Sequence, residues 1–220
     1  MEIDGHLFYL IVRSSVVWLM RYNLHTNKWY KCSTPHDKHD GSLHQSVAVS
    51  CNRQIYLFTQ TDIHCYNPRN RQWCRKTPSK YSLEVFNAVA IGTEIFCISY
   101  CFQKTIVYDT EKDSWLEYPG YKKTDVGFDG TNSLFVIENK LHAMINGCTF
   151  SMSQGEFRRV WQVCAFDNRE GIWRESSVLS DGRWYMCDRM FPVARMYLPY
   201  LNTSHADTQG TANPETEDGV

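Results

Sequence analysis

Tyr66-Asn-Pro-Arg-Asn-Arg-Gln-Trp73 decides the fold of this chain, because the same pattern occurs four times. In each copy an aromatic residue is followed, seven positions later, by tryptophan, with a polar turn between them. The other copies are Tyr22-Asn-Leu-His-Thr-Asn-Lys-Trp29, Tyr108-Asp-Thr-Glu-Lys-Asp-Ser-Trp115 and Phe166-Asp-Asn-Arg-Glu-Gly-Ile-Trp173. Successive copies begin 44, 42 and 58 residues apart. Self-similarity at such a period is typical of a repeat architecture.

Each copy belongs to a unit with strand signals in a fixed order. In the second unit, residues 46–50, 55–58 and 62–66 are rich in β-branched and aromatic residues, and a fourth strand begins at Gln72. Turn residues separate these segments at the spacing of an all-β protein. The third and fourth units repeat this order, and the extra length of the fourth, between Asn146 and Arg159, is predicted to be a surface loop. Four-stranded units repeated in this way are typical of β-propeller blades, so we predict an all-β propeller or partial propeller of about four blades.

The units are expected at about residues 1–33, 44–78, 86–119 and 132–178. The first unit is expected to lack its first strand, and residues 195–201 are predicted to form a lone strand that closes the ring. The propeller region would then cover residues 1–201. Residues 202–220 are acidic and poor in apolar residues, and we expect this tail to be disordered.

The order of strand, turn, second strand, Tyr-Asn turn and tryptophan resembles the kelch repeat. Pro35, Pro78 and Pro119 follow three of the tryptophans, as in that family, although the kelch Gly-Gly doublet is replaced, for example by Thr59-Gln60 and Ser99-Tyr100. The chain is most similar to the propeller part of the kelch-like and kelch-and-BTB proteins. The resemblance implies a substrate-binding module of a cullin-type ubiquitin ligase adaptor, in which a BTB domain, absent from these residues, contacts the ligase. Two arrangements stay open, a portion of a larger propeller and a closed ring of four blades.

Composition limits the alternatives. The net charge is −1, so charge gives no argument for nucleic acid or an acidic membrane as a partner. No apolar run has the ~20 residues of a membrane span, and no signal peptide is evident. Nine cysteines without a regular spacing indicate a reducing compartment, and we expect a cytoplasmic protein, with the nucleus as the alternative compartment.

Candidate chemical sites are few. His36, His39 and His44 share a polar segment with Asp37 and Asp40, but their spacing is not a metal-ligand pattern. Cys97 and Cys101 are four apart, about 13 Å in a strand, too far for a disulfide unless the chain bends. Phosphate loops, nucleophile elbows and His-Glu-x-x-His motifs do not occur, and the Tyr/His metal set of a copper-radical oxidase cannot be assembled. We therefore expect no enzyme activity, no metal and no cofactor, although a propeller enzyme stays an alternative.

The four tryptophans and their aromatic partners are predicted to be buried packing positions between blades, Tyr22, Trp29, Tyr66, Trp73, Tyr108, Trp115, Phe166 and Trp173. The kelch resemblance implies that a partner protein binds to the loops between the second and third strands and to the loops between blades. These segments include residues 36–44, 76–84, 100–104, 118–129 and 147–159. They combine Arg or Lys with aromatic residues, the usual hot-spot types. The predicted partner-binding residues are Arg13, Tyr81, Phe102, Tyr121, Lys122, Lys123, Phe157, Arg158 and Arg159.

The expected function is therefore recognition of a partner protein or peptide, and the expected ligand is an acidic or phosphorylated segment. A positively charged body remains once the acidic tail is set aside, and Arg and Lys suit carboxylate or phosphate. A cytoskeletal or scaffolding kelch protein without a ligase role is the alternative function.

Overall fold

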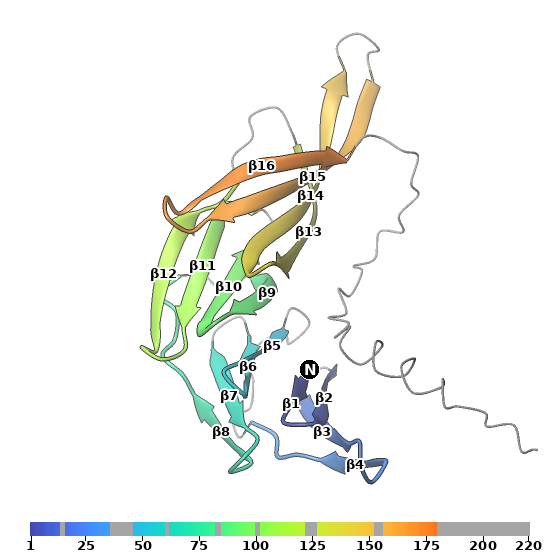
Figure 1. Ribbon diagram of the computed structural model, residues 1–220, viewed down its shortest axis with the longest axis vertical. Helices are drawn as coiled ribbons and strands as arrows, with labels where there is room; N and C mark the ends of the chain where they lie inside the picture. Colours follow the sequence, from blue (N-terminus) through green and yellow to red (C-terminus); the bar gives the residue numbers. More distant parts are fainter. Residues whose placement is uncertain are drawn as a thin grey trace, which may run out of the picture. The chain divides into compact units, whose positions relative to one another are not determined.

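The computed structural model describes residues 1–13, 16–35, 46–59, 62–81, 85–99, 102–121, 127–151 and 156–179. The chain divides into two compact units, Met1–Met190 and Phe191–Val220, and all described residues belong to the first. Figure 1 shows that this first unit is built from strands, and the described residues contain no helix. The predicted all-β class is confirmed.

Sixteen strands form four sheets, each of four antiparallel strands that are neighbours in chain order. The first sheet consists of β1 (Glu2–Ile3), β2 (His6–Arg13), β3 (Val16–Asn23) and β4 (Lys28–Lys31). The second consists of β5 (Val47–Cys51), β6 (Gln54–Phe58), β7 (Ile63–Asn67) and β8 (Gln72–Arg75). The third consists of β9 (Val85–Ile91), β10 (Glu94–Ser99), β11 (Lys104–Asp109) and β12 (Ser114–Pro119). The fourth consists of β13 (Gly127–Ile137), β14 (Lys140–Ser151), β15 (Glu156–Asp167) and β16 (Ile172–Leu179).

The polar turn of the repeated motif joins the third and fourth strands of each sheet. The residue after the aromatic is always Asn or Asp, and its side-chain oxygen accepts backbone N–H bonds from the turn. Asn67 Oδ1 accepts from Arg69 at 2.9 Å, and Asp109 Oδ1 accepts from Glu111 and Lys112, both at 3.0 Å. Such Asx turns satisfy backbone donors locally and start the reversal of the chain.

The residue two positions before each tryptophan has a left-handed backbone. Its φ is 54° at Asn27, 59° at Arg71, 50° at Asp113 and 66° at Gly171. The hydrogen bonds Arg71 N to Asn67 O and Gly171 N to Asp167 O close the second and fourth of these turns. The turn geometry therefore fixes the spacing of seven residues between the aromatic residue and the tryptophan.

Because of this spacing, the aromatic residue and the tryptophan are direct cross-strand partners. The register pairs Tyr22 with Trp29, Tyr66 with Trp73, Tyr108 with Trp115 and Phe166 with Trp173. Their ring centroids are 4.9 to 5.1 Å apart in all four sheets. Aromatic cross-strand pairs of this kind stabilise the outer hairpin of each sheet.

The aromatic residue of one sheet also packs on the sheet before it. Tyr66 contacts Phe8 of the first sheet, Tyr108 contacts Tyr56 of the second, and Phe166 contacts Phe96 of the third, each edge-on. Three core clusters of buried side chains join the first sheet to the second, the second to the third, and the third to the fourth. Neighbouring sheets therefore pack face to face in chain order, as blades of a propeller do.

Indole N–H groups add hydrogen bonds across these joints. Trp73 Nε1 donates to Ser33 O at 2.7 Å, and Trp115 Nε1 donates to Thr77 O at 3.0 Å. Both acceptors lie four residues after the tryptophan of the preceding unit. Trp173 departs from this rule, since its Nε1 donates to the hydroxyl of the buried Thr105 at 2.8 Å.

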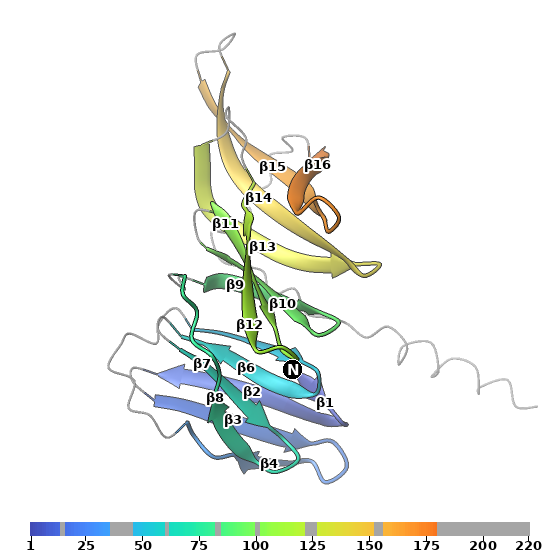
Figure 2. The same ribbon diagram turned by 90° about the vertical axis from the view of Figure 1, so that its left-hand side faces the viewer.

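Two sequence-based expectations are wrong. The first unit does have a first strand, because Glu2–Ile3 pairs with Leu7 and His6 of β2, and two residues are too few to give a pattern. The predicted loop 147–159 is mostly paired strand, since β14 and β15 continue to the pair Ser151–Glu156. Figure 2 shows these two long strands extending as a hairpin. The predicted closing strand 195–201 and the tail 202–220 lie outside the described residues.

Candidate binding surface

The predicted partner-binding residues occupy several different environments. Arg13 ends β2, Tyr81 lies in the segment between the second and third sheets, and Phe102 lies just before β11. Tyr121 follows β12, whereas Lys122 and Lys123 lie outside the described residues. Whether any of them binds a partner stays a prediction.

Phe102 is buried and cannot present its ring to a partner. Its exposed fraction is 0%, and its ring lies edge-on to Trp173 with centroids 4.9 Å apart. The turn that carries it is tight, because Phe102 N donates to Ser99 O at 3.0 Å and the φ of Phe102 is 48°. We therefore correct its assignment to a core residue. The sequence could not reveal this, since the ring is covered by residues of the next sheet.

Tyr121 is also a packing residue rather than an exposed one. It is 8% exposed and belongs to the core cluster between the third and fourth sheets. Its hydroxyl lies 3.4 Å from Gln162 Oε1 and 3.5 Å from Glu175 Oε2. Burial raises the pKa of the Tyr121 phenol, and the nearby Cys164 thiol and Glu175 carboxylate raise it further. The phenol therefore stays a neutral hydrogen-bond donor.

Phe157, Arg158 and Arg159 lie on β15, not in a loop. They pair with Phe150, Thr149 and Cys148 of β14, respectively. The residues on both arms include β-branched and aromatic types, which explains why the ladder continues through the insertion.

Among the three predicted binding residues whose side chains are described, Tyr81 is half-buried and lies beside charged groups. Its ring packs on the core cluster between the second and third sheets. Lys80 Nζ lies 5.1 Å and Lys104 Nζ 5.9 Å from the ring centroid. Both distances are in the cation–π range. We call Lys80, Tyr81 and Lys104 the lysine–tyrosine patch.

The patch joins two parts of the chain that are far apart in sequence. Lys80 is exposed, and Lys104 has a 55% exposed side chain that forms a 2.9 Å ion pair with Glu117 on β12. Sequence reasoning placed both lysines in candidate loops but selected neither. The Lys80–Tyr81 neighbours were the available signal, whereas the approach of Lys104 follows from sheet packing.

The repeat positions are structural, with one exception. Tyr66 and Tyr108 are at most 2% exposed, and Trp173 is 8% exposed, as expected of packing residues. Trp29 is 54% exposed, which contradicts its predicted burial. Its sheet is the first of the array, and among the described residues no core cluster covers this face.

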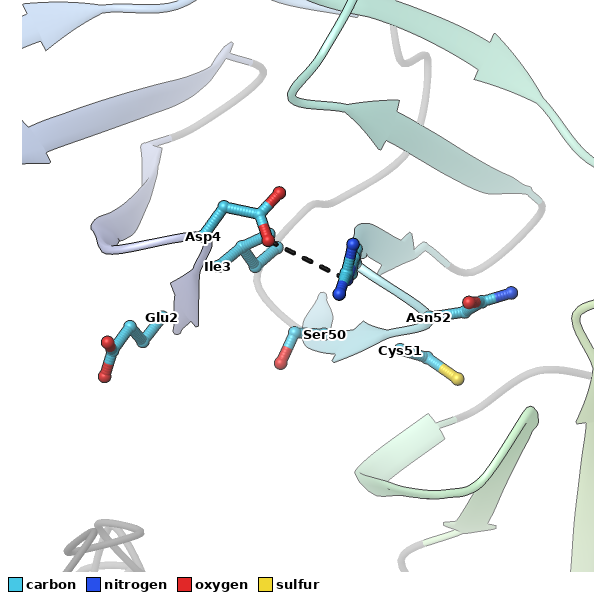
Figure 3. Close-up of a pocket in the computed structure, with 7 residues that line it drawn as sticks. Glu2, Ile3, Asp4, Ser50, Cys51 and Asn52 are labelled. Atoms are coloured by element: carbon cyan, nitrogen blue, oxygen red, sulfur yellow. Dashed lines mark ion pairs between the residues drawn. The ribbon is translucent and has the colours of Figure 1, made fainter. Parts of the chain in front are cut away.

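One cavity lies between the first and second sheets, near the turns that join the first and second strands of each. It has a volume of about 310 Å³ and is lined by Glu2, Ile3, Asp4, Ser50, Cys51, Asn52 and Arg53. Figure 3 shows its residues, which come from β1, from the end of β5 and from the turns that follow these two strands. Arg53 Nε lies 3.7 Å from Asp4 Oδ1, so these two charges largely offset each other, and the carboxylate of Glu2 is the third charge in the lining.

The thiol in this cavity is not set up as a nucleophile. Cys51 is 4% exposed, and its Sγ lies 3.4 Å from Gly92 O. Burial raises the pKa of the Cys51 thiol, although a hydrogen bond with Thr110 lowers it in part. A reactive cysteine needs the opposite shift. Cys51 therefore does not have the environment of a reactive thiol.

The described residues contain neither a metal-binding cluster nor a helix that could span a membrane. No group of three His, Cys, Asp or Glu side chains in the described ranges is arranged to hold a metal ion. The described part of the chain has no helix of the length and apolar character that a membrane span requires. Residues 36–44, with their three histidines, and Cys101 are outside the described ranges.

Comparison of the whole sequence with known proteins gave no match, either to a family model or to a curated protein.

Proposed function

We propose that this chain is a protein-recognition module that binds an acidic segment of a partner protein at the lysine–tyrosine patch. The observation that carries the proposal is the convergence of two lysine ammonium groups on one half-buried tyrosine ring. The ring offers apolar area at low entropic cost, and the lysines offer charge at its rim.

The architecture supports this role. The aromatic residues of the repeated motif pack within and between sheets, so loop residues outside the motif are free to vary without loss of the fold. Lys80 lies in the segment between β8 and β9, and Lys104 is the first residue of β11, so both lysines lie outside the strand interiors and contact the Tyr81 ring. Partner specificity in repeat proteins depends on such loops.

The kelch resemblance makes the proposal more specific. On this view the chain is the substrate-binding part of a cullin-type ubiquitin ligase adaptor, working in the cytoplasm and nucleus. No disulfide bond joins the cysteines whose side chains the structure describes, which fits a reducing compartment.

The test is a fluorescence-anisotropy titration with two labelled peptides, one with clustered glutamates and one with glutamines at the same positions. We expect the glutamate peptide to bind more tightly to the wild-type chain. The double substitution Lys80→Glu with Lys104→Glu should raise the Kd of the glutamate peptide by about tenfold, which corresponds to about 1.4 kcal/mol. The preference for the glutamate peptide should thereby be lost. The matched control is Lys28→Glu with Lys140→Glu, two exposed lysines outside the patch, which should change little.

Equal binding of both peptides to the wild-type chain would contradict acidic-segment recognition. An equal loss in the patch and control variants would reduce the effect to net charge alone, and would contradict the assignment to the patch.

A further inference from the structure

The three joints between sheets use the same register positions. In each joint the later sheet covers the sheet before it. On the face of the later sheet that makes this contact, an aliphatic residue of the second strand lies beside the aromatic–tryptophan pair of the motif. The members are Ile55, Tyr66 and Trp73 in the second sheet, Ile95, Tyr108 and Trp115 in the third, and Leu141, Phe166 and Trp173 in the fourth. The aliphatic residue is 0% exposed in all three sheets. These positions form what we call the covering face of a sheet.

The first sheet has the same covering face, but it is exposed. Leu7 pairs with Tyr22, as Ile55 pairs with Tyr66, and Tyr22 pairs with Trp29. Leu7 is 38% and Trp29 is 54% exposed. Tyr9, two residues further along β2, is 61% exposed, whereas its counterpart Leu57 is 0% exposed. Three of the seven exposed large apolar residues among the described side chains therefore lie on one sheet face.

The fourth sheet has the complementary situation. In the first three sheets, the position that receives the next covering face holds Phe8, Tyr56 or Phe96, each at most 3% exposed. The register places His142 at this position of the fourth sheet, where it is half-buried. His142 stacks on Phe135 with ring centroids 5.5 Å apart and an interplanar angle of 14°. Ile137, at the end of β13, is 52% exposed.

We propose that the covering face of the first sheet of one copy packs on the receiving face of the fourth sheet of a second copy. The chain makes this joint three times between its own sheets, and the two exposed faces are the two halves of a fourth. In such a contact Tyr9, Tyr22 and Trp29 lie on Phe135, Ile137 and His142 of the other copy. A second copy fits because it offers a covering face on its first sheet and a receiving face on its fourth sheet. Both faces have the register that already joins sheets within one chain.

The contact is head-to-tail, so two different surfaces meet and each copy retains one of each. Heterologous contacts close into rings when the rotation allows it. Two copies joined by two such contacts hold eight sheets in all, within the range of four to eight blades in propellers. The proposal is independent of the lysine–tyrosine patch and of the function assigned to it.

Sedimentation velocity of the full 220-residue chain, in reducing buffer from about 1 to 50 µM, tests the contact. We expect a concentration-dependent species of twice the 25.8 kDa chain mass. Tyr9→Glu on the first sheet and Ile137→Glu on the fourth should each raise the dissociation constant by about tenfold or more. Leu116→Glu is the matched control, because Leu116 is a 46% exposed apolar residue of the third sheet outside both faces.

Mixing the two variants separates this arrangement from its alternatives. The Ile137→Glu chain keeps an intact covering face and the Tyr9→Glu chain keeps an intact receiving face, so an equimolar mixture should regain one contact and part of the association. A circular dichroism spectrum like that of the wild-type chain establishes that both variants are folded.

Three results would overturn the proposal. A monomer at every concentration excludes a second copy, whether the faces are left open or covered by the chain itself. An equal loss of association with Leu116→Glu indicates unspecific contacts. Variants that stay monomeric when mixed exclude the head-to-tail arrangement.

Discussion

At the scale of single residues, the repeated motif is a set of positions with separate physical tasks. The Asn or Asp accepts the turn N–H groups, the residue before the last strand takes a left-handed φ, and the tryptophan packs on its cross-strand aromatic residue. The sequence revealed the two aromatic positions because they are large and regularly spaced. It did not reveal the burial of Phe102 and Tyr121, because their surroundings come from a different sheet.

Gly120 shows the tightest backbone contact. A Cβ at this position would lie 1.8 Å from Phe102 O, and Gly120 N donates to Gln103 O at 2.8 Å. We expect Gly120→Ala to lower the free energy of unfolding by about 1–3 kcal/mol, because the backbone must shift to make room. Urea unfolding measures the change. As a control, Gly92→Ala has no close neighbours, although its φ of 59° is itself unfavourable for alanine. A loss at position 120 no larger than at position 92 would contradict the close contact.

The tryptophans should differ in their contribution to stability according to exposure. Trp173→Ala removes an indole that is 8% exposed, and the expected cost is about 3–5 kcal/mol. Trp29→Ala removes one that is 54% exposed, so the monomer should lose less than about 1 kcal/mol. The comparison is made by denaturant unfolding below the concentration at which the chain associates. Equal costs would mean that Trp29 is covered in solution by the chain itself.

At the scale of strands and turns, the sequence predicted best where the pattern is long and regular. The four strands of the second and third units follow alternating β-branched and aromatic residues, and the structure has strands there. Glu2–Ile3 was missed because two residues carry no periodicity. The β14–β15 hairpin was missed because Gly, Ser and Gln near its tip resemble a loop, whereas the pairing of β14 with β15 decides the outcome.

The turn of the third sheet adds a titratable group to the motif. Asp113 Oδ1 accepts hydrogen bonds from the Tyr108 hydroxyl and from Thr77 N, the latter at 3.1 Å. Partial burial raises the pKa of Asp113, but these hydrogen bonds outweigh it, so the net pKa lies below the ordinary value. Because the pKa of Asp113 is lower in the folded than in the unfolded chain, its contribution to stability is fully present above the unfolded-state pKa of about 4. This contribution is lost as the pH falls from there through the folded-state pKa.

Asp113→Asn should therefore weaken the pH dependence of folding. Asparagine keeps a side-chain acceptor and tolerates the left-handed φ of 50°, so stability at pH 7 should fall only modestly. Between about pH 5 and pH 2, the free energy of unfolding of the variant should decline less steeply than that of the wild-type chain. Urea unfolding at a series of pH values measures both slopes. Identical slopes would show that Asp113 is not a source of acid sensitivity.

At the scale of the whole molecule, one joint repeated along the chain explains both the packing and the surface. The covering faces of the second, third and fourth sheets each bury the motif of their sheet against the sheet before it, and the core clusters follow this order. Composition and spacing predicted four units but not which residues of the loops would meet. The lysine–tyrosine patch depends on Lys104 approaching Tyr81 from a different sheet, at 5.9 Å, and no local pattern reports such a contact.

The central claim is that the motif aromatic residue of the second, third and fourth sheets stabilises its own sheet against the one before it, and a double-mutant cycle tests it directly. Phe96 and Phe166 lie edge-on across the joint of the third and fourth sheets, with centroids 5.9 Å apart, and neither carries a polar group. The free energy of unfolding is measured for Phe96→Leu, Phe166→Leu and the double variant, with Phe8 and Phe166 of non-adjacent sheets as the control pair. We predict a coupling of about 0.5–1.5 kcal/mol for Phe96 with Phe166, and less than about 0.5 kcal/mol for the control. Strictly additive effects for both pairs would contradict the account.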